Sequence, residues 1–239
     1  TVTACDFNQD IQIKQLSFAY TKGQEVLKNI NLVLEKGKTI ALVGATGSGK
    51  TTIINLLSRF YDYEKGSILI GETELKSIQL KYLRANIAVV LQDVFLFSDS
   101  IHNNITLGNQ EITREQVVSA AKAVGAHDFI SQLPRGYDYA IGERGGELSV
   151  GQRQLLAFIR AFLYNPIVLI LDEATSNLDN ESEEMIQKAT EKLTLNRTSI
   201  IIAHRLSTIQ KADKIVVLEK GEIVEQGSHQ LLLKKAGYY

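Results

Sequence analysis

The sequence predicts an α/β fold: a parallel sheet covered by helices, with antiparallel strands near the N-terminus and a helical insertion near the middle. The main evidence is three short apolar runs, KTIALVG (38–44), PIVLILDE (166–173) and TSIIIAH (198–204). Continuous Val, Ile and Leu runs of this length are typical of strands buried on both faces, as in a parallel sheet between helices. Segments 11–20 and 30–37 alternate between apolar and polar residues, which predicts half-buried antiparallel strands instead.

The middle of the chain, from about 110 to 163, has helical periodicity. Thr113 and Gln116 have the spacing of a capping box, in which each side chain bonds the other residue's backbone amide. Two apolar stripes with the spacing of a helix face follow, namely Val117, Val118, Ala121 and Val124, and then Leu155, Leu156, Ile159 and Phe162. We therefore expect one domain over residues 1–239, with a helical subdomain inserted at roughly 93–163.

Three further local elements complete the expected layout. Residues 52–60 and 180–194 have the patterns of helices. The stretch KIVVLEKGEIVEQG (214–227) predicts a β-hairpin that turns at Lys220 and Gly221.

Composition narrows the class of protein. The chain has 239 residues, of which 44% are hydrophobic and 22% charged, as in an ordinary globular protein. A formal net charge of −1 provides no overall attraction to nucleic acid or to an anionic membrane surface. The single cysteine, Cys5, cannot form an internal disulfide, which favours a reducing setting. No apolar run approaches about 18 residues, so no membrane span is predicted, and because the sequence begins at Thr1 we expect a piece of a longer chain.

The stretch GATGSGKT (44–51) has the pattern G-x-x-x-x-G-K-[ST] between a buried strand and a helix. The glycines let the backbone bend so that its N–H groups converge on phosphate oxygens at the positive end of the helix. Lys50 adds a charge for the β- and γ-phosphates, and Thr51 offers a hydroxyl to Mg²⁺. The alternative is a glycine-rich turn with an incidental lysine. The flanking strand and helix favour nucleotide binding, without defining the reaction.

Asp172 and Glu173 stand at the carboxyl end of a predicted buried strand, where open α/β sheets bind their ligands. The first acid of such a pair supports Mg²⁺. The second points elsewhere, because strand side chains alternate, and it can polarise an attacking water. The alternative is that the pair caps the following helix.

Polar residues also end two other apolar runs. His204 closes the run 198–204, from which its imidazole can reach the γ-phosphate in the same crevice, although a strand-end histidine is more often a structural hydrogen-bonding group. Gln92 closes the run IAVVLQD and can contact the metal or the water. The remaining histidines are expected to be surface or structural residues: His102, His127 and His229.

Together and in this order, these elements resemble the nucleotide-binding domain of an ATP-binding cassette (ABC) transporter over essentially the whole chain. The matching motifs are the phosphate loop at 44–51, the Q-loop glutamine Gln92, the signature LSVGQ (148–152), the Walker B run IVLILDE, the D-loop SNLD (176–179), the switch histidine His204, and Tyr20 as the aromatic residue on which adenine stacks. The resemblance implies a P-loop NTPase (RecA-like) core sheet with helices, an N-terminal antiparallel β subdomain and an inserted helical subdomain.

The resemblance also implies roles for individual residues, with ATP and Mg²⁺ as cofactors and ATP hydrolysis coupled to transport as the activity. The implied catalytic residues are Glu173, His204, Gln92 and Lys50. The implied nucleotide contacts are Tyr20, Gly44, Ala45, Thr46, Gly47, Ser48, Gly49, Lys50, Thr51, Thr52, Ser149, Gly151, Gln152 and Asp179. The implied Mg²⁺ ligands are Thr51, Gln92 and Asp172.

Longer stretches, 84–105 and 142–162, look like the exporter branch of the family, in multidrug and lipid exporter-like half-transporters. There a membrane domain precedes this domain in one polypeptide. The implied partners are a second nucleotide-binding domain, identical or not, and the transmembrane domain of the same polypeptide; nucleic acid is not among them. The implied location is the cytoplasmic face of the cell membrane, with the full-length protein an integral membrane protein.

In that family two domains pair head to tail, and each ATP lies between one domain's phosphate loop and its partner's signature. Asp179 would lie near the opposite phosphate loop, although it also suits a plain N-cap for the helix 180–194. Locally the signature segment has the pattern of a capped helix, with Ser149 and Gln152 at the spacing of a capping box. The signature has Val150 where the family most often has glycine. As the first helical residue it needs only a negative φ and keeps its N–H, so we expect an altered rather than an inactive site.

Three other classes fit parts of the pattern. A cassette ATPase acting on DNA or in translation is expected to show a basic face or a long coiled-coil insertion, which this sequence lacks. A P-loop phosphotransferase needs an acceptor-binding lid and no signature helix. A nucleotide-gated binding module is expected to lack Glu173. The transporter ATPase accounts for all the motifs.

Overall fold

The computed structural model describes residues 5–142, 145–173, 180–235 and 237–239. The chain divides into two compact units. The first comprises Thr1–Val89, Ile167–Glu173 and Asn196–Tyr239, and the second Val90–Pro166 and Ala174–Leu195. The second unit contains the segment 93–163, for which the sequence predicts helices, together with a later segment that includes the predicted helix 180–194.

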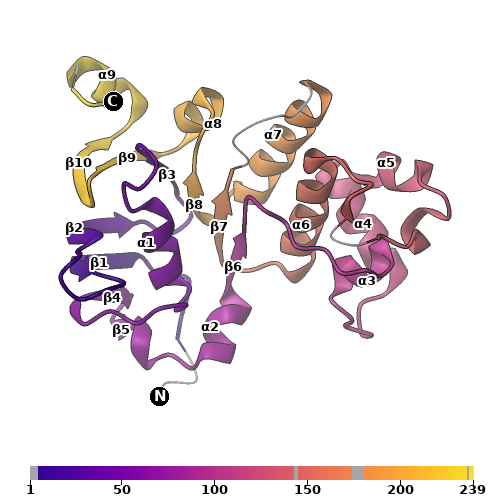
Figure 1. Ribbon diagram of the computed structural model, residues 1–239, viewed down its shortest axis with the longest axis horizontal. Coiled ribbons are helices and arrows are strands. Elements are labelled where there is room, and N and C mark those ends of the chain that lie inside the picture. Colours follow the sequence, from indigo (N-terminus) through magenta and orange to yellow (C-terminus); the bar gives the residue numbers. More distant parts are fainter. Residues whose placement is uncertain (1–4, 143–144, 174–179, 236) are drawn as a thin grey trace. The chain divides into compact units, whose positions relative to one another are not determined.

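A six-stranded sheet with the order β10-β9-β3-β8-β7-β6 forms the centre of the first unit (Figure 1). Its strands are β3 (Thr39–Val43), β6 (Ile87–Val90), β7 (Val168–Asp172), β8 (Thr198–Ile202), β9 (Lys214–Glu219) and β10 (Glu222–Gly227). β3 is parallel to both β8 and β9, and β7 is parallel to β8. The three predicted buried strands are therefore confirmed, and they adjoin one another as β3, β8 and β7.

The predicted hairpin is confirmed as β9 and β10, which pair antiparallel at the edge of this sheet. Lys220 and Gly221 turn the chain with positive φ angles of 49° and 86°. Two successive positive φ angles match the right-handed twist of a two-residue hairpin, and glycine adopts such a φ without strain.

A second, four-stranded sheet has the order β2-β1-β4-β5 and is antiparallel throughout. Its strands are β1 (Ile11–Phe18), β2 (Leu27–Leu34), β4 (Lys65–Ile70) and β5 (Thr73–Glu74), of which β4 and β5 are additional to the predicted strands. The strand predicted over 30–37 instead ends at Leu34. The backbone turns there, with a bond from Lys38 N to Glu35 O and a φ of 71° at Gly37.

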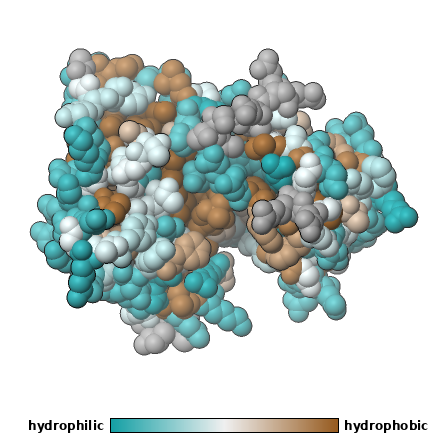
Figure 2. Space-filling view, in the orientation of Figure 1, coloured by the Kyte–Doolittle hydropathy of each residue, from teal (hydrophilic) through white to brown (hydrophobic). Residues whose placement is uncertain are grey.

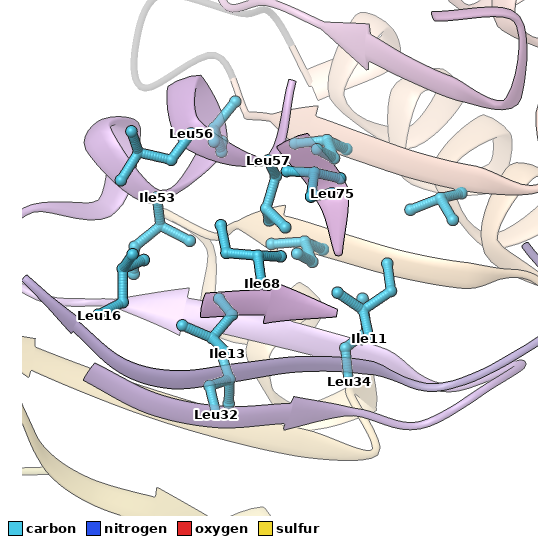
Figure 3. Packing of buried hydrophobic residues seen from close by; sticks show 14 of the residues in the cluster. Ile11, Ile13, Leu16, Leu32, Leu34, Ile53, Leu56, Leu57, Ile68 and Leu75 are labelled. Carbon is cyan, nitrogen blue, oxygen red and sulfur yellow. The ribbon is translucent and has the colours of Figure 1, made fainter. Parts of the chain in front are cut away.

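Helix α1 (Lys50–Leu57) packs into a hydrophobic core that also takes side chains from both sheets. In Figure 3, Ile53 and Leu57 point from α1 toward the antiparallel sheet, where Ile68 lies. The helix was expected over 52–60. It ends earlier because Arg59 has a left-handed φ of 50°.

The first unit ends in a helix that exposes two leucines. The remaining helical elements of this unit are α2 (Leu80–Asn86), α8 (Leu206–Lys211), α9 (His229–Lys235) and a short 3-10 turn at Leu75–Ser77. Leu231 and Leu233 of α9 are exposed, and Figure 2 shows apolar side chains gathered over this helix.

Across the residues that the structure describes, no helix has both the length and the hydropathy needed to cross a membrane.

The second unit is helical, as predicted. It contains α3 (Ile101–Thr106), α4 (Arg114–Val124), α5 (His127–Gln132), α6 (Val150–Tyr164) and α7 (Asn180–Thr194), with a 3-10 turn at Gly136–Asp138. α6 packs against α3, α4 and α7. The capping box of Thr113 and Gln116 is confirmed at the start of α4.

The burial predicted for one residue of this unit, Phe162, is wrong. Leu155, Leu156 and Ile159 are buried in α6, but Phe162 is 36% exposed. The chain is buried at every residue from 154 to 159, around the whole circumference of the helix. The middle of α6 is thus covered on all sides, whereas Phe162 lies in its last turn. Periodicity shows which face of a helix is apolar, but not how far the neighbouring helices extend along it.

Candidate functional site

The loops that follow β3, β7 and β8 begin at one edge of the parallel sheet. Leu42 pairs with Ile202, and Ile202 pairs in turn with Asp172, so these three residues form one row across the strands. The next residues along each strand therefore leave the sheet at the same edge. Gly44, Glu173 and His204, which follow these strands, therefore start from the same edge of the sheet.

The loop at 44–51 requires its glycines. Gly44, Gly47 and Gly49 have φ angles of 150°, 80° and 108°. A Cβ on Gly44 would lie 2.2 Å from the carbonyl oxygen of Leu218, and the left-handed φ disfavours any other residue as well. α1 begins at Lys50, within the last residues of this loop, so its free N–H groups lie at the loop. Gly44, Ala45, Thr46 and Gly47 are exposed, whereas Ser48 and Gly49 are buried.

The Lys50 ammonium is held by the loop. Its Nζ donates to the carbonyl oxygens of Gly44 (2.8 Å) and Ala45 (2.9 Å), and to Ser48 Oγ (3.4 Å). Burial lowers the pKa of Lys50, and the Asp172 carboxylate opposes this shift. Lys50 and Asp172 thus interact electrostatically, although they lie on different strand–loop segments. The neighbouring residue Thr51 is exposed.

Tyr20 presents an aromatic ring that is anchored by its hydroxyl. Tyr20 Oη donates to Thr52 Oγ1 (3.2 Å) and accepts from Asn55 Nδ2 (3.1 Å), and both partners belong to α1. The rings of Phe18 and Tyr61 each meet it edge-on, with centroids 4.9 Å away. Tyr20 is nevertheless 46% exposed. The ring therefore has accessible surface for stacking and a fixed attachment to the helix that follows the phosphate loop.

Glu173 is almost fully buried, with 4% of its surface exposed. Its Oε2 accepts from the backbone N–H groups of His204 (3.0 Å) and Arg205 (3.3 Å), and its Oε1 accepts from the hydroxyl of Thr208. Sequence reasoning did not identify Thr208, because a threonine four residues after a histidine has no distinguishing signal. The His204 side chain itself is exposed.

In the second unit, the predicted capping box of the signature segment is confirmed. Ser149 Oγ accepts from Gln152 N (3.1 Å), and Gln152 Oε1 accepts from Ser149 N (3.0 Å). Val150 is the first residue of α6, as expected, and Gly151 follows within the helix. Arg153 donates to the carbonyl oxygen of Leu148 (2.6 Å), which ties the preceding loop to the helix. Serine's hydroxyl proton stays available to donate to a ligand.

Two other predicted site residues are Gln92 and Asp179. Gln92 follows β6 and belongs to the second unit. Asp179 lies outside the described residues. Within the described ranges, no group of three or more His, Cys, Asp and Glu side chains is arranged to hold a metal ion.

Comparison with known proteins agrees with this geometry. The family model described as "ABC transporter" matches residues 27–176. An "ATP-dependent lipid A-core flippase" from Syntrophus aciditrophicus (strain SB) is 50% identical over 232 residues, covering 97% of this chain and 38% of the relative. A second relative is a "multidrug export ATP-binding/permease protein" from Staphylococcus aureus (strain NCTC 8325 / PS 47). It is 54% identical over 230 residues, covering 96% of this chain and 40% of the relative.

A solved structure described as a bacterial Atm1-family ABC exporter with ATP bound superposes with a TM-score of 0.92 at 40% sequence identity, over 99% of this chain and 41% of that chain. The chain thus spans about two fifths of the length of these relatives. The fold is that of a P-loop NTPase of the ABC type, as the resemblance implied. Because the family model matches residues 27–176, well over half of the sequence, the chain belongs to the ABC transporter family.

Proposed function

We propose that this chain binds and hydrolyses MgATP and that hydrolysis drives the conformational cycle of a membrane exporter. The observation that carries the proposal is the row of Leu42, Ile202 and Asp172, because it brings the phosphate loop, an acid pair and a histidine to one sheet edge. A glycine loop with a lysine binds phosphates, and an adjacent carboxylate and imidazole supply proton-transfer and hydrogen-bonding groups.

In this proposal the triphosphate lies along the phosphate loop. Backbone N–H groups of the loop and of the first turn of α1 bind phosphate oxygens, and Lys50 neutralises the β- and γ-phosphates. Its ammonium now donates to loop carbonyls, so the phosphates would exchange these neutral acceptors for charged ones. Tyr20 stacks on the adenine.

Mg²⁺ suits the residues available here. It prefers oxygen ligands and keeps a few protein contacts beside substrate phosphates and waters. Thr51 and Asp172 would hold it, and it would neutralise charge that develops on the phosphate oxygens. The predicted metal contact of Gln92, in the second unit, stays a prediction of the sequence.

The proposed reaction is the attack of water on the γ-phosphorus. Glu173 takes a proton from the water, the new P–O bond forms, and the bond from the γ-phosphorus to the bridging oxygen breaks. ADP and inorganic phosphate are the products. His204 donates a hydrogen bond to the γ-phosphate, and such groups act by stabilising the charge of the transition state.

The signature segment serves a partner domain in this proposal. Ser149 and the N-terminus of α6 form a second helix start whose hydroxyl and N–H groups suit the γ-phosphate of an ATP bound to another domain. Gly151, Gln152 and Asp179 would take part in the same contact. The partner is a second nucleotide-binding domain, identical or different.

The second partner is a transmembrane domain in the same polypeptide. Phe95 and Phe97 are 61% and 54% exposed and stack edge-on at 5.0 Å, which is an apolar surface suited to protein contact. The relatives' names combine ATP binding with a permease or flippase. The domain would then work at the cytoplasmic face of the membrane. Sequencing upstream of Thr1 tests this, because about six hydrophobic spans are expected there and their absence would contradict it.

The test of hydrolysis uses Glu173→Gln, which keeps the side chain's size and removes its basicity. We expect binding of MgATP to be retained and kcat to fall by about 10²–10⁴-fold, the usual worth of a general base. Lys50→Ala is the matched control and should weaken nucleotide binding itself. Equilibrium binding of a fluorescent ATP analogue and phosphate release measure the two effects. Unchanged turnover in Glu173→Gln would remove Glu173 as the base.

A further inference from the structure

We propose that Thr208 is a positioning residue that holds Glu173 in a resting orientation, and that release of this contact controls the rate of hydrolysis. The inference rests on the proposed role of Glu173 as general base. Its basis is the set of three donors that surround the buried carboxylate: the hydroxyl of Thr208 and the backbone N–H groups of His204 and Arg205.

All three donors come from one short segment of the chain, residues 204–208, which leaves β8 and begins α8. The segment is internally bonded, since Thr208 N and Ile209 N both donate to the carbonyl oxygen of Arg205. Glu173 N in addition donates to Ile202 O (3.2 Å) at the end of the same strand. Glu173 is thus bonded to the end of β8 through its backbone N–H, and to the segment 204–208 through both oxygens of its carboxylate.

This arrangement opposes catalysis by Glu173. A carboxylate has about four acceptor positions, and three of them are directed at the protein here. A general base must lie within hydrogen-bond reach of the water whose proton it takes. One acceptor position is left, but Glu173 is only 4% exposed, so water reaches the carboxylate poorly until the cradle opens.

The same segment offers a trigger for that release. His204 contributes an amide to the cradle, and its exposed imidazole is the group proposed to bond the γ-phosphate. A movement of His204 toward the phosphate would withdraw its amide from Glu173. In this proposal the release follows nucleotide binding, as a step of the bound complex, so it limits kcat and leaves nucleotide affinity unchanged.

A purely structural role predicts a different outcome. If the Thr208–Glu173 contact only stabilises the start of α8, its loss lowers stability and leaves the catalytic rate the same or lower. If it restrains the base, its loss raises the catalytic rate without changing nucleotide affinity.

The test is Thr208→Val in the 239-residue chain, with Thr208→Ser as the matched control that keeps the hydroxyl. A hydrogen bond to a charged group changes an equilibrium by about tenfold or more. We therefore expect kcat for ATP hydrolysis to rise by about three- to tenfold in Thr208→Val, with KM for MgATP within about twofold of the parent. Thr208→Ser should match the parent. An unchanged or lower kcat in a folded Thr208→Val protein would overturn the proposal.

A second measurement does not depend on activity. Hydrogen exchange of the His204 and Arg205 amides should be faster in Thr208→Val than in Thr208→Ser, while the amides of β8 keep their protection. Equal exchange in the two variants would overturn the proposal.

The double variant Thr208→Val/Glu173→Gln separates this inference from the proposed function. It should be as inactive as Glu173→Gln alone, and acceleration in the absence of the carboxylate would overturn the role of Thr208. If Glu173→Gln is inactive but Thr208→Val is not accelerated, the base assignment stands and only the restraint is wrong. If Glu173→Gln keeps full turnover, the proposed function fails first.

Discussion

The hydroxyl of Tyr20 connects the proposed adenine platform to the phosphate-binding helix. It bonds Thr52 and Asn55, the third and sixth residues of α1, whose first residue is Lys50. A phenylalanine would provide the same stacking surface without this attachment. The ring's position, and not only its presence, is therefore set by two polar contacts.

We predict that Tyr20→Phe weakens MgATP binding by about two- to fivefold. It keeps the stacking ring and loses only the two hydroxyl bonds that position it, so affinity falls by less than their full worth of about 0.5–1.5 kcal/mol each. Tyr20→Ala should weaken it by more than about tenfold, because base–aromatic stacking is worth about 1–3 kcal/mol. Titration with a fluorescent ATP analogue measures both. Tyr164→Phe is the control, because it removes a hydroxyl that bonds Thr106 O in the second unit. Equal binding by Tyr20→Ala and the parent would refute stacking on Tyr20.

At the level of elements, α6 begins in the same way as α4. Both helices have a capping box, and both are preceded by a residue in extended conformation. Locally the signature segment is thus an ordinary capped helix, and nothing in its own hydrogen bonds marks it as part of an ATP site. In the proposed function this segment contacts ATP that is bound to a partner domain. Val150 is the first residue of α6, so its side chain lies at the end of the helix that makes this contact.

Replacing Val150 by glycine tests this assignment. We predict that Val150→Gly changes the turnover of the domain pair by at least about twofold, while the ATP affinity of the monomer stays the same. Glycine at this position should cost no more than about 1 kcal/mol of stability. Arg114→Gly, the first residue of α4, is the matched control and should leave turnover unchanged. A changed monomer affinity in Val150→Gly would show that the signature contacts the chain's own nucleotide.

For the whole molecule, the two compact units contain different halves of the proposed ATP sandwich. The phosphate loop, the acid pair and His204 belong to the first unit, and Ser149 with α6 belongs to the second. ATP bound between two copies gains contacts with both, which favours the paired state over separate domains.

We therefore predict that Glu173→Gln is mainly monomeric without nucleotide and dimeric with saturating ATP, because slow hydrolysis preserves the bridging triphosphate. Light scattering at high protein concentration measures the mass. The ADP-bound form provides the control and should remain monomeric, since it lacks the γ-phosphate. A monomer at saturating ATP would contradict the sandwich.

Local sequence patterns predicted much of this fold. The buried strands β3, β7 and β8, the hairpin at Lys220 and Gly221, and both capping boxes depend on interactions between residues close in sequence or on an apolar run. The phosphate loop was predicted for the same reason, since its glycines meet a local backbone requirement. Phe162 was misplaced because its burial depends on the lengths of other helices.

The sequence by itself thus determined the buried parallel strands, the hairpin, the helical insertion, the family and the chemical groups of the candidate site, because these follow from periodicity, turn requirements and motif spacing. Only the tertiary structure decided how those groups are held. Tyr20 is tied to Asn55 across 35 residues, and Glu173 is bonded to Thr208 across 35 residues. The first pair forms only where the end of β1 meets α1, and the second only where β7 and β8 lie side by side in parallel. The partner that a polar side chain finds therefore depends on which distant segments the fold brings near.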